Sequence, residues 1–289
     1  MAKKIAVLSG KGGTGKTLLS VNLASVAGDC LYVDCDVEEP NGHLFLKPEQ
    51  VRKETVCVKI PVVEKALCDG CRNCVKFCKF NAIAFMKDKP YVFEEVCHSC
   101  GGCVLVCPQK AIAEKEKPIG EIRRGNSNRI KSHSGIMNVG EVSGVPIIEK
   151  LMEAVRKESG TVIIDCPPGS ACIVMESIKD ADYCLLVAEP TVFGAHNLKM
   201  VYELVRLFNK PHGVVLNKCL PGENPAEDFC IKNNVPILGR IPFDKQLGKL
   251  SSDALIAADE DERFKTLFSG LLNKIMEEAD DETASDSKR

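Results

Sequence analysis

The chain has 289 residues, enough for one or two domains with a sizeable core. A hydrophobic content of 45%, a charged content of 27% and a formal net charge of −2 describe an ordinary globular protein, and they exclude a general attraction to nucleic acid or anionic lipid. Trp is absent and there are only four Tyr, which argues against a base-stacking surface.

The cysteine content and the first residues indicate the compartment. No apolar stretch approaches the length of a membrane span, and the Met-Ala-Lys-Lys start leads into a strand rather than a signal peptide. Sixteen cysteines without an export signal predict metal-binding thiolates in a reducing environment. We therefore expect a cytoplasmic protein with no nucleic-acid partner and no stable membrane anchor.

The first predicted elements are an apolar strand at residues 5–9 and a helix from about residue 18, with a glycine-rich loop between them. Such a loop turns backbone N–H groups toward phosphates, and the following helix adds its positive dipole end. Lys16 would reach the β and γ phosphates, and the Thr17 hydroxyl would ligate Mg²⁺. A chance glycine turn is the less favoured alternative. The loop comprises Gly10, Lys11, Gly12, Gly13, Thr14, Gly15, Lys16 and Thr17.

Strands and helices alternate over most of the chain. A strand at 31–33 ends in Asp34-Cys35-Asp36, and further strands are predicted at 161–164, 183–187, 213–216 and 237–241, with helical patterns such as 198–208 between them. This order predicts a mostly parallel, doubly wound α/β sheet with helices on both faces.

The region 57–118 breaks this rhythm and is interpreted as an inserted domain. The predicted organisation is therefore a nucleotide-binding domain in two parts, 1–56 and 119–276, with the insertion at 57–118. Residues 277–289 are acidic and Ser-rich, which predicts a disordered tail.

The insertion contains two cysteine runs of one spacing, C-x2-C-x2-C-x3-C, which is the pattern of a bacterial ferredoxin domain with two [4Fe–4S] clusters. In such domains the fourth cysteine of each run ligates the other cluster. This rule predicts one cluster on Cys68, Cys71, Cys74 and Cys107, and the other on Cys97, Cys100, Cys103 and Cys78. Zinc is the competing metal, but it usually takes separated C-x2-C pairs. Lys79 stands where the pattern usually has proline.

Lys11, directly after the first glycine, makes the loop similar to the deviant Walker A loop of the MinD, ParA, Mrp and nitrogenase iron protein ATPases. Other segments resemble that family in order along the chain: an acidic strand end at 34–36, Asp-Cys-Pro-Pro-Gly at 165–169, Asn-Lys at 217–218 and Ile-Pro-Phe-Asp at 241–244. With the cysteine runs, the chain resembles Mrp/MinD-type P-loop ATPases that carry an inserted ferredoxin domain.

The resemblance implies a role for each matching residue. Lys11 would cross a dimer interface to the ATP of the partner subunit, so that activity requires an ATP-dependent homodimer, or a heterodimer with a paralogue. Asp36 would position the attacking water, and Thr17, Asp36 and Asp165 would hold Mg²⁺. The catalytic set would be Lys11, Lys16, Asp36 and Asp165, and ATP would also contact Thr191, Asn217, Pro242 and Asp244.

Two further stretches have simpler interpretations. Arg123, Arg124, Arg129 and Lys131 form a basic stretch without aromatic residues, more typical of a solvated loop than of a nucleic-acid site. The helical pattern at 263–276 has one apolar side and is followed by an acidic tail, which favours a core-packing helix over a membrane anchor.

Three functions are compatible with this combination. The first, which the paired clusters favour, is an ATPase whose nucleotide-switched dimer is coupled to electron transfer through two [4Fe–4S] clusters to a redox partner protein. The second is an iron–sulfur cluster assembly or carrier ATPase. The third is a MinD/ParA-like positioning ATPase whose clusters sense redox state.

Overall fold

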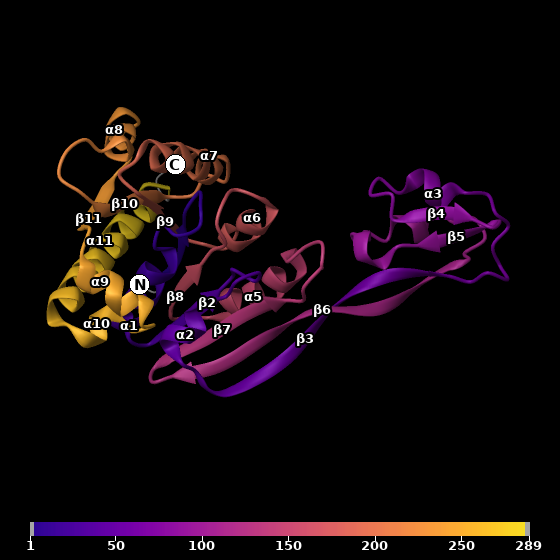
Figure 1. Cartoon of the computed structure of the whole chain (residues 1–289), viewed down its shortest axis with the longest axis horizontal. Coiled ribbons are helices and arrows are strands. Elements are labelled where there is room, and N and C mark those ends of the chain that lie inside the picture. Colours follow the sequence, from indigo (N-terminus) through magenta and orange to yellow (C-terminus); the bar gives the residue numbers. More distant parts are fainter. Residues whose placement is uncertain (1–2, 287–289) are drawn as a thin grey trace.

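The computed structural model describes residues 3–286, with side chains up to residue 280. These residues form a large α/β body from which a two-stranded ribbon extends, with a small module at its far end (Figure 1). Both described termini lie in the body, so the chain enters and leaves the module along the ribbon.

The body is built on one sheet of nine strands within the described residues, in the order β11-β10-β9-β1-β8-β2-β7-β6-β3. Neighbouring strands from β11 to β7 are parallel, whereas β6 and β3 are antiparallel. The predicted mostly parallel sheet is confirmed. The strands are β1 (Lys4–Leu8), β2 (Cys30–Asp34), β3 (Glu49–Val63), β6 (Ile112–Ser127), β7 (Ile130–Met137), β8 (Thr161–Asp165), β9 (Tyr183–Ala188), β10 (His212–Cys219) and β11 (Ile237–Pro242).

Helices cover both faces of the sheet and bury two separate apolar cores. One core contains side chains from α5 (Val145–Lys157), α6 (Cys172–Ile178), α7 (Val192–Leu207) and α8 (Pro225–Lys232). The other contains side chains from α1 (Lys16–Ala27), α2 (Gly42–Leu46), α9 (Lys245–Ser252), α10 (Ala257–Glu260) and α11 (Glu262–Asp286). The central strands are buried on both sides, as their continuous apolar sequences require.

The ribbon consists of β3 and β6, paired from Glu49 opposite Asn126 to Val63 opposite Ile112. The boundaries predicted at 57 and 118 fall inside these two strands. Apolar residues alternate in β3 across the predicted boundary at residue 57, whereas residues 113–118 of β6 are mostly exposed and polar, so the two strands were not recognised as one ribbon. The module contains α3 (Asn73–Phe77), the hairpin of β4 (Ile83–Met86) and β5 (Lys89–Val92), a 3₁₀ turn at Glu94–Val96, and α4 (Gly102–Leu105).

The C-terminal segment corrects one expectation. Residues 277–286, predicted as part of a disordered tail, continue α11, while residues 287–289 lie outside the described residues. The helix is held here because Ile275 and Ala279 are buried and Lys3 pairs with Asp280 at 3.0 Å. Upstream, Phe264, Phe268 and Leu271 are buried, as a core-packing helix predicts. Among the described residues, no helix combines the length and apolarity needed to cross a membrane.

The ribbon geometry predicts that the body folds without the module. Replacing residues 64–111 by an Asn-Gly turn would join the paired residues Val63 and Ile112 as a two-residue hairpin. We expect this variant to unfold in urea in one cooperative transition, as the full chain does. Aggregation of the shortened chain, with loss of its cooperative transition, would show instead that the module stabilises the body.

Candidate nucleotide site and cysteine module

A large cavity lies where the parallel strands end. It measures about 650 Å³ and opens at the carboxyl ends of β1, β2, β8, β10 and β11, the usual ligand position in such sheets. Nine of the predicted site residues line it: Gly12, Gly13, Gly15, Lys16, Thr17, Asp36, Asn217, Pro242 and Asp244. The predicted site residues therefore converge on this cavity, although other residues form most of its wall.

The glycine loop requires glycine at two positions that line this cavity. Gly13 and Gly15 have φ values of +77° and +100°, which side chains other than glycine rarely adopt. A Cβ on Gly15 would also lie 2.3 Å from Nδ2 of Asn217. Directly after Gly15, Lys16 begins α1 and is 6% exposed. A buried cationic side chain therefore lines the cavity at the positive end of that helix. This arrangement suits a polyphosphate.

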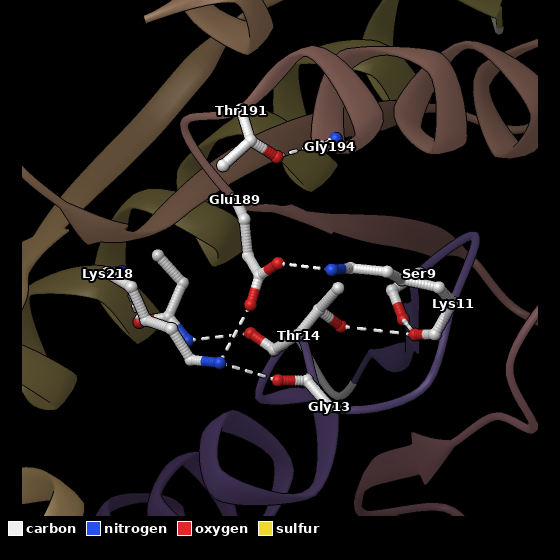
Figure 2. Close-up of polar contacts among 9 residues, drawn as sticks. Ser9, Lys11, Gly13, Thr14, Glu189, Thr191, Gly194 and Lys218 are labelled. Carbon is white, nitrogen blue, oxygen red and sulfur yellow. Dashed lines mark hydrogen bonds and ion pairs between the residues drawn. The ribbon is translucent and has the colours of Figure 1, made fainter.

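Glu189, at the end of β9, holds two lysines against the loop (Figure 2). Its Oε2 lies 2.5 Å from Nζ of Lys11, and its Oε1 lies 2.7 Å from Nζ of Lys218. Lys218 also donates to the carbonyl of Gly13 at 2.7 Å. Burial alone would raise the pKa of Glu189, but the hydrogen bonds from both lysines hold it below its ordinary value. The sequence analysis assigned no role to Glu189 or Lys218. The available signal for Glu189 was an acidic residue between a buried strand and a helix start at Pro-Thr.

Two carboxylates from neighbouring strands lie side by side beneath the loop. Asp34 and Asp165 are paired in register on β2 and β8, and both are almost fully buried. Tyr32 donates its hydroxyl to Oδ2 of Asp165 at 3.0 Å, whereas Oδ1 accepts no hydrogen bond within the part of the chain that the structure describes. Burial raises the pKa of Asp165, and the charge of Lys16 offsets part of this. A buried carboxylate oxygen without a donor beside Lys16 and Thr17 fits a divalent cation bound with phosphate.

Asp34, to which the sequence assigned no separate role, fixes the segment that follows β2. Its Oδ1 accepts from the backbone N–H of Asp36 at 3.1 Å, and its Oδ2 accepts from that of Gly42 at 2.9 Å. Asp36 is thereby turned toward the cavity and is half-buried. Burial raises its pKa to about 6, against the opposing charge of Lys16.

Other predicted residues lie outside the cavity wall. Thr191 caps α7, where its hydroxyl accepts from the backbone N–H of Gly194 at 2.9 Å (Figure 2). Gly10 packs against the backbone of Asn197, and Thr14 is buried with its carbonyl accepting from Asn217 at 2.7 Å. Asp165 lies beneath the loop and Lys11 points to Glu189.

Asp244 lines the cavity and also caps α9 through the N–H groups of Gln246 and Leu247.

The module contains two smaller cavities, each bordered by four cysteines. The thiols are Cys68, Cys71, Cys74 and Cys107 in one, and Cys78, Cys97, Cys100 and Cys103 in the other, which are the two predicted sets. Among the described residues, no three or more His, Cys, Asp or Glu side chains stand close enough to hold a single metal ion. Four cysteines nevertheless line each of the two cavities.

The two halves of the module repeat each other in detail. The Sγ atoms of Cys78 and Cys107 each accept a backbone N–H, from Ala82 and Ala111, at 3.3 Å. Burial raises the pKa of Cys74 and raises that of Cys103 to about 11, with neighbouring cysteines adding to the effect. Such thiols favour the protonated form unless a cation accepts their charge. Free thiolates are therefore disfavoured at Cys74 and Cys103.

The predicted basic stretch does not form one surface. Arg124 pairs with Glu54, Arg129 with Asp29 at 2.6 Å, and Lys131 with Glu158 at 2.8 Å. Arg123 and Arg124 are successive residues of β6, so their side chains point to opposite faces of the sheet.

The raised pKa of Asp36 predicts a pH-dependent stability difference. The folded-state pKa of about 6 lies above the ordinary value of 3.8, so the folded protein binds this proton more readily than the unfolded chain. The free energy of unfolding therefore falls as pH rises through this interval, and the charged carboxylate is destabilising above it. Asp36→Asn should raise the melting temperature of the nucleotide-free protein at about pH 7.5 but have little effect at about pH 3, below both pKa values.

Glu223→Gln is the matched control, because Glu223 is an exposed loop residue. An equal effect of Asp36→Asn at both pH values would contradict the assignment of this proton to Asp36.

Comparison with known proteins agrees with this geometry. A model of the CobQ/CobB/MinD/ParA nucleotide binding domain matches residues 5–256. An uncharacterised protein of Methanocaldococcus jannaschii is 32% identical over 278 residues, covering 95% of this chain and 96% of its own. An iron–sulfur cluster carrier protein of the same organism is 25% identical over 297 residues, covering 94% and 84%.

Among solved structures, the septum site-determining protein MinD of Pyrococcus horikoshii, complexed with Mg-ADP, matches with a TM-score of 0.61 at 18% identity, covering 95% of this chain and 96% of that chain. The cell division ATPase MinD of Pyrococcus furiosus matches with a TM-score of 0.59 at 19% identity, covering 96% and 99%. At these identities the two structural matches show only a shared fold, whereas the match over residues 5–256 shows the family. The chain belongs to the CobQ/CobB/MinD/ParA family of nucleotide-binding domains.

Proposed function

We propose that this protein binds and hydrolyses Mg-ATP and couples its nucleotide state to electron transfer through two [4Fe–4S] clusters to a partner protein. The observation that carries the proposal is the grouping of the module's eight cysteines into two sets of four, on a ribbon that belongs to the same sheet as the nucleotide cavity. Family membership supports the nucleotide half.

In the nucleotide half, the backbone N–H groups of the glycine loop and Lys16 would bind the phosphates. Thr17, Asp36 and Asp165 would hold Mg²⁺, for which the unpartnered Oδ1 of Asp165 is suited. Asp36 would orient the attacking water, since this half-buried carboxylate lines the cavity within reach of the charge of Lys16. The wall formed by Asn217, Pro242 and Asp244 would receive the base and ribose.

In the redox half, the two sets of cysteines would bind one [4Fe–4S] cluster each, and the clusters would supply one-electron transfer. The N–H groups of Ala82 and Ala111 would stabilise the charge on the sulfur atoms of Cys78 and Cys107, which tunes reduction potential. The module lies away from the body at the end of the ribbon, where a redox partner protein can approach it (Figure 1).

The connection between the halves would run through the segment after β2. Asp34 ties this segment to the start of α2, and β3 begins three residues after α2 ends. The ribbon is also joined to the nucleotide strands through β7, which pairs with β2 on one side and β6 on the other. A change at Asp36 on ATP binding would therefore act on the base of the ribbon.

An iron–sulfur cluster carrier is the second candidate, because the carrier of Methanocaldococcus jannaschii is similar over most of both chains. The two functions differ in cluster lability. Clusters that pass to an apo-ferredoxin acceptor, or that a chelator removes, would favour the carrier. Clusters that survive both treatments and cycle reversibly with dithionite would favour electron transfer.

Two substitutions test the proposed division of labour. Lys16→Ala removes a buried charge partner of the phosphates and should weaken ATP binding by about 2–5 kcal/mol, or roughly thirty- to several-thousandfold, while the iron–sulfur absorbance stays. Cys74→Ala should reduce iron from about eight to about four atoms per chain and leave ATP affinity unchanged. Both are measured on anaerobically purified protein by iron assay and calorimetry. Loss of ATP binding in a folded Cys74→Ala variant would contradict two separable sites.

The contact between Lys11 and Glu189 predicts a step in dimer formation. If Lys11 crosses to the nucleotide of a partner subunit, it must first leave Glu189, which holds it at 2.5 Å in the single chain. Glu189→Gln removes this ion pair and should strengthen ATP-dependent dimerisation by roughly three- to tenfold. Sedimentation with a non-hydrolysable ATP analogue measures the effect.

Glu54→Gln is the matched control, because Glu54 also accepts from two cations, Arg124 and Lys150, but lies on the ribbon. The Mg-ADP affinity of each variant, measured under conditions that keep it monomeric, reports whether its loop is intact. Unchanged or weaker dimerisation of Glu189→Gln with an intact loop would mean that Lys11 stays in its own subunit.

A further inference from the structure

A cavity separate from those already described lies between α2 and the strands β3, β6 and β7, and measures about 440 Å³. It occupies the sheet face opposite α5. Lys53, Arg123 and Ser134 are paired in register across the three strands and line the cavity, whereas their neighbours Glu54 and Arg124 point to the other face, toward α5.

The wall of this cavity is positively charged. Lys47, Lys53 and Arg123 contribute cations, and within the described part of the chain none of the lining residues is a carboxylate. Lys53 and Arg123 share one carboxylate nearby, that of Glu121, at 3.4 and 2.6 Å. Lys47 makes no ion pair with any residue that the structure describes. These three cations therefore carry more positive charge than the single carboxylate of Glu121 neutralises.

A buried hydroxyl without a partner lies within the wall of the same cavity. Ser132 is 1% exposed, lines the cavity, and its Oγ makes no hydrogen bond within the described residues. Buried polar groups in folded proteins are almost always hydrogen-bonded, and leaving one unpaired is destabilising. Ser134, two residues along β7, adds a second hydroxyl that is 4% exposed. An acceptor atom bound in the cavity would satisfy Ser132.

The remaining wall is apolar, formed by Pro48, Val51 and Ile136. We propose that this cavity binds a small organic anion, whose carboxylate or phosphate group is held by Lys53, Arg123 and the Ser132 hydroxyl while its carbon skeleton lies on the apolar wall. An inorganic ion would contact only the charged and hydroxyl part of this wall and not the apolar part.

Helix α2 separates this cavity from the nucleotide cavity. Leu44 and Phe45 line the nucleotide side, and His43 and Lys47 line the anion side. The helix is fixed at its start by Asp34 and near its end by the Ser127 hydroxyl, which donates to the carbonyl of Leu46. Because both ligands contact this one short helix, occupancy of either cavity alters affinity at the other.

Calorimetry on the full-length, cluster-loaded protein tests the site, with citrate as the carboxylate probe and glycerol 3-phosphate as the phosphate probe. Saturating Mg-ADP keeps the probes from the glycine loop. We expect at least one probe to bind, and Ser132→Ala and Lys53→Gln each to weaken it by about tenfold. Lys59→Gln removes the same charge from the same strand outside the cavity and should have little effect.

Ser132→Ala should keep or raise the melting temperature without a probe, since it deletes an unpaired hydroxyl, so lost binding cannot be ascribed to misfolding. Absence of binding by both probes, or equal losses from Lys53→Gln and Lys59→Gln, would overturn the site. An ADP affinity unchanged by the bound probe would overturn the coupling through α2. The variant comparison can be run without ADP, so it stands even if the proposed ATPase function fails.

Discussion

Parallel pairing of β1, β8 and β2 is the constraint on which the nucleotide site depends. The register sets Val7 opposite Asp165 and Asp165 opposite Asp34, so the glycine loop and two buried carboxylates emerge at one edge of the sheet. Burial raises the pKa values of these two carboxyl groups. Groups of the protein itself, among them Tyr32, Lys16 and two backbone N–H groups, offset only part of this effect. The site is built to be completed by a cation and phosphates.

The same sheet carries the cysteine module, so the nucleotide cavity and the module belong to one framework of strands. β7 lies beside β2, β6 beside β7, and β3 beside β6, so hydrogen-bonded strands connect the segment after β2 to the module. A ribbon of paired strands transmits displacement better than a flexible linker, because each strand is held in register by its neighbour. Coupling therefore needs no contact between the module and the nucleotide.

How far the sequence could predict the structure depended on the kind of signal. Apolar strands flanked by glycine or Asp specified the parallel sheet, and the cysteine spacing specified the two sets of thiols that line the module's cavities. The ribbon was not predicted because the alternating Val56, Val58, Ile60 and Val62 of β3 straddle the predicted boundary at residue 57, and residues 113–118 of β6 are mostly polar and exposed. α11 extends past residue 276 because of distant contacts with Lys3. Glu189 acts through Lys11 and Lys218, neighbours only in the fold, so the local pattern could mark its position at a strand end but not its role.

The most direct test of the central claim is to measure the reduction potentials and reduction rates of both clusters without nucleotide, with ADP and with a non-hydrolysable ATP analogue. If the ribbon couples the two sites, the analogue changes a potential or a rate relative to ADP, and Lys16→Ala abolishes the change. Identical potentials and rates in all three states would contradict the coupling and leave two unconnected sites on one chain.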